Sequence, residues 1–118
     1  MDDELWFCGE VIAPGGLGAL APLLERVSWP VEVWRSGHDG SDVLRAWKGS
    51  VQLDMDAGQG TGRLFSGTVE ADRNAALRLL DELSQAFRDA GMRHRIELYD
   101  EADGSLLGYL HHAWSRAE

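Results

Sequence analysis

Short segments in which apolar and polar residues alternate constrain the fold of this chain more than any other feature. The clearest is residues 51–56, Val-Gln-Leu-Asp-Met-Asp, where every second residue is apolar. A period of two is typical of a β-strand with one buried face. Other segments have a similar alternation, or are rich in aromatic and branched residues, and end at turn residues. They predict six further strands, at residues 5–12, 31–35, 43–47, 63–70, 93–99 and 106–113.

Two segments instead have the spacing of amphipathic helices. The first stripe consists of Leu17, Leu20, Leu24 and Val27, with Pro22 placed in the first turn or at a kink. The second stripe follows Asp72, a good N-cap, and ends at Gly91, the expected C′ residue. Its apolar members are Ala76, Leu80, Leu83, Phe87 and Ala90. These patterns predict an α+β fold: a mainly antiparallel sheet with two helices packed on one face.

The length of 118 residues fits one domain, residues 1–118. Residues 4–56 and 63–114 also resemble each other. Residues 7–11 match residues 65–69, and residues 31–34 match residues 96–99, in the same order. This favours two β-α-β-β units, with residues 51–56 as an added strand between them. Chance similarity is the alternative, because glycine in strands and Asp-Gly in turns are common on physical grounds.

Charge and cysteine content exclude several classes of protein. The formal net charge is −9 and the pI about 4.8, which argues against binding nucleic acid or an anionic membrane. Cys8 is the only cysteine, so no intrachain disulfide and no cysteine-based metal cluster can form. The start of the chain is acidic, and no apolar run approaches the roughly 18 residues of a membrane span. We therefore expect a cytoplasmic protein.

No motif identifies a reaction. His111 and His112 are adjacent in a predicted strand, so their side chains point to opposite faces and cannot easily share a metal ion. The glycines of residues 15–18 lack the spacing of a phosphate-binding loop, and Cys8 has no neighbouring base. We therefore expect no enzymatic activity, no cofactor and no bound metal.

The predicted strands define a candidate binding face. Where the apolar residues of three strands turn toward the helices, alternation sends their acidic and aromatic residues to the other face. These residues are Glu32, Trp34, Asp54, Asp56, Glu97 and Tyr99. Tryptophan and tyrosine dominate binding hot spots, and carboxylates around them would steer a basic partner. In the alternative interpretation, Trp34 and Tyr99 only cover the sheet.

The whole profile resembles the small, acidic, single-domain immunity proteins with which bacteria neutralise their own toxins. The resemblance rests on the length, the −9 charge and the acidic strands around Glu32, Asp54, Asp56 and residues 97–101. It implies a stoichiometric inhibitor that covers an effector's active site. The negative charge makes a basic toxin or enzyme the expected partner, and we expect the chain to be a monomer or a homodimer. Immunity families share no single fold, so the resemblance assigns no residue roles.

Two other functions stay open at this point. One is a small ligand-binding or catalytic α+β domain that uses His94, His111 or His112 as a titrating group. The other is a dimeric accessory subunit that associates through the open sheet face or an exposed strand edge.

Overall fold

The computed structural model describes residues 3–35, 42–56 and 62–114. They form one antiparallel sheet in the order β2-β3-β4-β5-β1-β6-β7, with two helices, so the predicted α+β class is confirmed. The strands are β1 (Asp3–Ile12), β2 (Val31–Arg35), β3 (Asp42–Lys48), β4 (Val51–Asp56), β5 (Gly62–Ala71), β6 (His94–Asp100) and β7 (Leu106–His112). The helices are α1 (Leu17–Arg26) and α2 (Arg73–Asp89).

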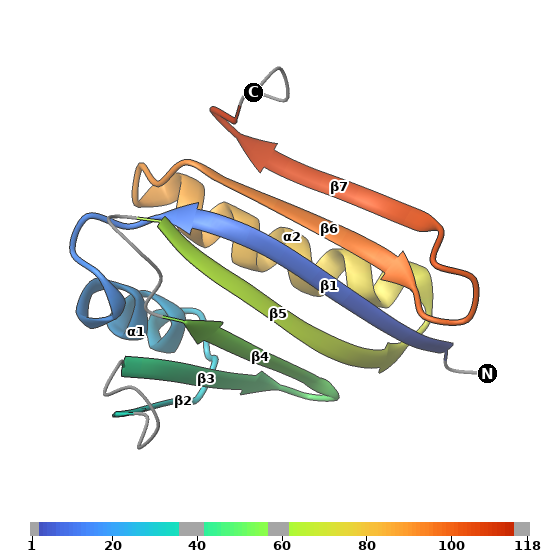
Figure 1. Cartoon of the computed structure of the whole chain (residues 1–118), viewed down its shortest axis with the longest axis horizontal. Helices are drawn as coiled ribbons and strands as arrows, with labels where there is room; N and C mark the ends of the chain where they lie inside the picture. Colours follow the sequence, from blue (N-terminus) through green and yellow to red (C-terminus); the bar gives the residue numbers. More distant parts are fainter. Residues whose placement is uncertain (1–2, 36–41, 57–61, 115–118) are drawn as a thin grey trace.

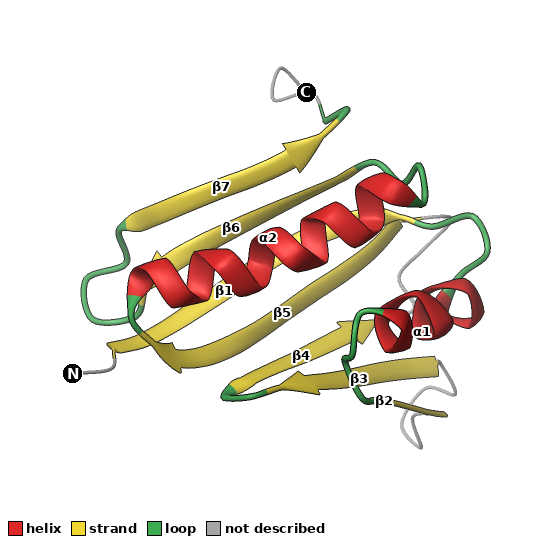
Figure 2. Ribbon diagram, turned by 180° about the vertical axis from the view of Figure 1, so that it is seen from behind, coloured by secondary structure: helices red, strands yellow, loops and turns green. Residues whose placement is uncertain are grey.

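Both helices lie on the same face of the sheet (Figures 1 and 2). Helix α1 packs on β2 and β3, whereas α2 crosses the other part of the sheet and contacts β5, β1, β6 and β7. The side chain of Asp72 accepts a hydrogen bond from the Ala75 amide at 2.8 Å, as expected of an N-cap. In α1, Pro22 lies in the second turn rather than the first.

The two central strands are packed through two reciprocal Phe–Gly pairs. Phe7 lies opposite Gly67, and Gly9 lies opposite Phe65. A Cβ atom on Gly9 would lie 2.6 Å from the Phe65 ring, and a Cβ atom on Gly67 would lie 2.6 Å from the Phe7 ring. Each ring therefore occupies the space that the opposite glycine leaves empty. The phenylalanines and glycines that match between residues 7–11 and 65–69 are the residues that form this reciprocal contact.

Strand order differs between the two halves of the chain. Helix α2 connects β5 to β6, which are separated in the sheet by β1 alone. Helix α1 connects β1 to β2, which are separated by β5, β4 and β3. Residues 31–34 thus lie at an edge of the sheet, while residues 96–99 lie beside a central strand. The repeat of two β-α-β-β units stays a hypothesis outside the central pair.

The core lies between the sheet and the helices. The α2 stripe is buried as predicted at Ala76, Leu80, Leu83 and Phe87, whereas Ala90 is exposed at the C-cap. In the part of the chain that the structure describes, neither helix has the length and apolar character needed to cross a membrane.

Candidate partner-binding face

The side of the sheet that faces away from α1 and α2 is covered by no other helix of the described residues, and we call it the open face. Its side chains alternate with the core residues of each strand, and strand register places them side by side. The open face comprises Glu4, Trp6, Cys8 and Glu10 of β1; Glu32 of β2; Val43, Arg45 and Trp47 of β3; Gln52, Asp54 and Asp56 of β4; Leu64, Ser66, Thr68 and Glu70 of β5; Arg95, Glu97 and Tyr99 of β6; and Tyr109 and His111 of β7.

One cross-strand row passes over the whole sheet. Its members, in sheet order, are Glu32, Arg45, Asp54, Ser66, Cys8, Glu97 and Tyr109. Neighbouring strands are about 4.8 Å apart, so Glu32 and Glu97 are separated by about 24 Å. The row therefore has the dimensions of a protein-binding surface rather than those of a small-molecule pocket.

The structure brings five of the six predicted site residues to this face. Glu32, Asp54 and Glu97 share the row described above. Asp56 and Tyr99 lie on the same face in the adjacent rows. The backbone of Trp34 pairs with Val43, but its side chain lies outside the described part of the structure.

Acidic groups predominate on the described part of the open face. Seven carboxylates lie there, on Glu4, Glu10, Glu32, Asp54, Asp56, Glu70 and Glu97. Two guanidinium groups accompany them, on Arg45 and Arg95, and both form ion pairs with acids of this face. Glu4 and Glu70 lie directly opposite each other and are exposed, an arrangement that repulsion between like charges disfavours. The surplus of carboxylates favours a cationic partner.

An aromatic and ionic network holds one end of the open face in place. Trp6 stacks on Tyr99 with ring centroids 4.5 Å apart and planes inclined by 16°. The Tyr99 hydroxyl donates a hydrogen bond to one carboxylate oxygen of Glu97, and Arg95 donates to the other. The hydrogen bond to Glu97 is the main reason that the pKa of Tyr99 is raised to about 12. The hydroxyl therefore stays protonated at neutral pH and continues to donate.

Sequence reasoning missed four members of this network, Trp6, Glu10, Arg95 and Trp114. Arg95 lies 3.9 Å from Glu10, and the Trp114 ring lies 5.6 Å from the Arg95 guanidinium carbon, within cation–π range. The alternation of residues 5–12 places Trp6 on the same face as Cys8, so the position of Trp6 could have been predicted from the sequence. The position of Trp114 could not be predicted, because this residue follows the last strand and no repeating pattern indicates the face on which it lies.

The centre of the open face is hollowed where two small side chains meet. Cys8 and Ser66 lie opposite each other, in a hollow of about 300 Å³ whose lining also includes Asp54, Asp56 and Arg95. Burial, and then the negative charge of Glu97, raise the pKa of the Cys8 thiol. Cys8 is therefore a neutral thiol at physiological pH and not an activated nucleophile.

His94 has a structural role, and its ring centroid lies 6.1 Å from that of His112. His94 is fully buried on the helix side, where Nδ1 donates to the Met92 carbonyl at 3.0 Å. Its Nε2 then accepts a hydrogen bond from the Ser84 hydroxyl at 2.6 Å. Both ring nitrogens are thus occupied, and burial lowers the pKa of His94. His111 lies on the open face, whereas His112 lies opposite His94 on the helix face.

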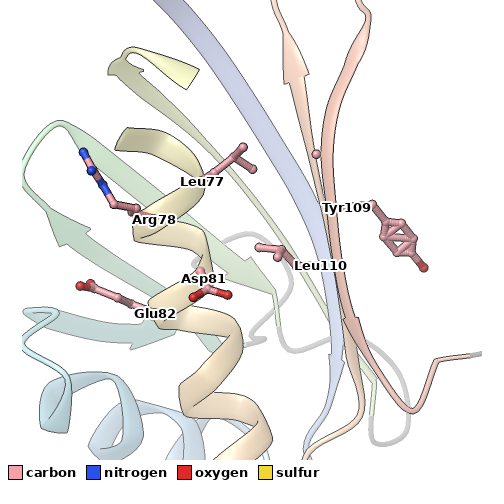
Figure 3. Close-up of a pocket in the computed structure, with 7 residues that line it drawn as sticks. Leu77, Arg78, Asp81, Glu82, Tyr109 and Leu110 are labelled. Carbon is pink, nitrogen blue, oxygen red and sulfur yellow. The ribbon is translucent and has the colours of Figure 1, made fainter. Parts of the chain in front are cut away.

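Residues 3–35, 42–56 and 62–114 contain no group of three or more His, Cys, Asp or Glu side chains arranged to hold a metal ion. A groove of about 600 Å³ lies on the helix side, between α2 and β7. Figure 3 shows Leu77 and Leu110 at this groove, whereas Tyr109 points away from α2.

No protein-family model, curated protein or solved structure matches the chain significantly. The open face and the groove beside β7 are therefore the two features from which a function can be inferred.

Proposed function

We propose that this protein is an acidic, cytoplasmic protein-binding module that captures a basic protein on its open face. More specifically, we propose a bacterial immunity protein that inhibits a cognate toxin by stoichiometric binding, without catalysis of its own. The observation that carries this proposal is the excess of seven carboxylates over two arginines on a sheet face that no helix covers.

The chemistry of the face suits a protein partner. Exposed carboxylates such as Glu32 and Asp56 accelerate encounter with a basic surface through long-range attraction. The Trp6–Tyr99 stack adds a large aromatic contact of the kind that dominates binding energy at interfaces. Because Glu97 fixes Tyr99 before the partner arrives, little side-chain entropy is lost on binding.

The environments of His94 and Cys8 argue against the catalytic alternative. His94 uses both ring nitrogens in the core, and burial together with the negative charge of Glu97 raises the pKa of the Cys8 thiol, so the thiol is not activated as a nucleophile. We therefore favour binding over catalysis as the task of this face.

The test uses the basic protein encoded beside this gene as the candidate toxin. We expect its activity to fall to zero at one equivalent of this chain. Trp6→Ala should weaken the complex by about 2 kcal/mol, an ordinary hot-spot effect. Arg26→Ala, an exposed change on the helix side, is the control and should leave affinity unchanged.

Cys8 provides a second readout that needs no variant. It is the only cysteine of the chain and lies at the centre of the open face, so alkylation reports on that face alone. We expect the partner to slow alkylation of Cys8. An inhibitory complex in which Cys8 reacts at its free rate would contradict binding through the open face.

A further inference from the structure

Strand β7 is an edge strand without a single charged residue. Its sequence, Leu-Leu-Gly-Tyr-Leu-His-His, contains no Asp, Glu, Lys, Arg or Pro, whereas each of the other six strands carries at least two charged residues. At the opposite edge, β2 contains Glu32 and Arg35 and follows Pro30. Charges, prolines and β-bulges are the usual means by which edge strands avoid pairing with another chain. Edge β7 lacks charges and proline, and its one irregularity lies near its start, opposite Leu98 and Tyr99.

The groove on the helix side continues this edge. Leu77 of α2 and Leu110 of β7 supply its apolar surface. Gly108 allows α2 to lie close to β7, because a Cβ atom there would collide with Leu77. The exposed lining contains charges of both signs, on Arg78, Asp81 and Glu82.

We propose that two copies of this chain associate edge to edge by antiparallel pairing of their β7 strands. Pairing of the strand about a two-fold axis at Tyr109 sets Gly108 opposite Leu110 of the second copy and leaves the irregular start of β7, at Leu106 and Leu107, at the two ends of the contact. Both grooves then meet on the helix side. Each copy supplies Arg78 together with Asp81 and Glu82, so the symmetric contact contains both positive and negative side chains from each copy.

Charge selects a second copy over the basic partner as the occupant. At −9, two copies repel each other, and this repulsion costs least where the paired strands carry no charge. Among the strands described, only β7 meets that condition. A basic protein is drawn instead to the carboxylates of the open face, which β7 lacks.

Two arginines of α2 already contact β7, and their positions are compatible with this pairing. Arg73 donates to the Leu107 carbonyl at 2.9 Å, and Arg88 donates to the His111 carbonyl at 3.4 Å. A carbonyl oxygen has two lone pairs and can accept a ladder hydrogen bond as well. The pairing leaves both open faces uncovered on the same side of a continuous sheet, so it is independent of the function proposed above.

The experiment measures the mass of the chain by light scattering over a range of concentrations. We expect a monomer–dimer equilibrium in the full chain. Tyr109→Lys places two lysines opposite each other at the axis and should raise the dimer Kd at least about tenfold. Val33→Lys introduces the same charge on edge strand β2, where Val33 is 46% exposed, and should leave the dimer intact.

Hydrogen exchange on the unaltered chain keeps the proposal testable if Tyr109→Lys folds poorly. Amides of β7 should exchange more slowly as concentration rises, whereas amides of β2 should not change. A chain that stays monomeric at every concentration, a dimer that resists Tyr109→Lys, or a dimer that Val33→Lys disrupts would each overturn the proposal.

Discussion

His94 has no exposed surface, and its two ring nitrogens connect three parts of the chain. Nδ1 donates to the Met92 carbonyl before β6, and Nε2 accepts from Ser84 of α2, so the neutral tautomer is the one that fits. Protonation would place a positive charge on a fully buried ring, and this loss of solvation is the main reason that the pKa of His94 is lowered. The neutral ring is therefore part of the core and a source of pH-dependent stability.

We expect acid to destabilise the protein through His94. Its pKa is lowered in the folded state, so the unfolded chain binds a proton at higher pH than the folded chain does. The stabilising contribution is complete above the ordinary pKa of 6.5 and is lost as the pH falls through the lower folded value. Urea unfolding at pH 7.5 and at lower pH should show this loss.

Two histidine variants separate this effect from general acid sensitivity. His94→Gln should be less stable at pH 7.5 and should lose part of the dependence on pH. His111→Gln, at an exposed histidine on the open face, should retain most of the dependence, because the charge of His111 is the smallest of the causes that lower the pKa of His94. Equal pH dependence in His94→Gln and the unaltered protein would show that His94 contributes none of it.

At the scale of elements, the β1–β5 pair forms the centre of the sheet. The Phe7–Gly67 and Phe65–Gly9 pairs surround the Cys8–Ser66 pair, and the Phe65 ring also lies 6.0 Å from Phe87 of α2. The glycines thus set how closely the aromatic rings approach the sheet. The two strands pack as one unit because each supplies one phenylalanine ring and one glycine that leaves room for the ring of the other strand.

A methyl group at Gly67 should therefore disturb this unit. We expect Gly67→Ala to cost at least about 1–3 kcal/mol of unfolding free energy, because a Cβ atom there would collide with the Gln52 carbonyl oxygen and lie 2.6 Å from the Phe7 ring, so both the backbone and the ring must move. Gly18→Ala in α1 is the control: a Cβ atom there would meet no other atom within 4 Å, and the change should stabilise by about 0.4–1 kcal/mol. Thermal or urea unfolding measures both. Effects of the same sign would contradict the packing argument.

The surface of the whole molecule has two sides, which differ in their charge and in whether helices cover the sheet. The helices cover one face of the sheet, and the acidic open face is left on the other (Figure 2). A partner attracted to the net charge alone would respond equally to charge changes on either side. A partner that docks on the open face would respond to changes on that side only.

Matched charge reversals distinguish these cases. Glu32→Lys with Asp56→Lys alters two exposed acids of the open face, and Glu25→Lys with Asp81→Lys makes the same change in net charge on the helices. We expect the first pair to slow association with the basic partner more than the second, with the difference shrinking as salt screens the field. Stopped-flow kinetics measures both. Equal slowing would place docking elsewhere.

The sequence alone determined the strands, the α2 stripe with its Asp72 cap, and the face on which Asp54, Glu97 and Tyr99 lie. These properties follow from patterns that repeat every two residues or every three to four residues. Such patterns indicate which side chains of a short segment are buried. Tertiary structure decided the strand order, the stacking of Trp6 on Tyr99 and the hydrogen bond between Ser84 and His94. Each of these joins segments far apart in the chain. Which distant segments pair depends on how all strands and helices pack together, and no local period contains that information.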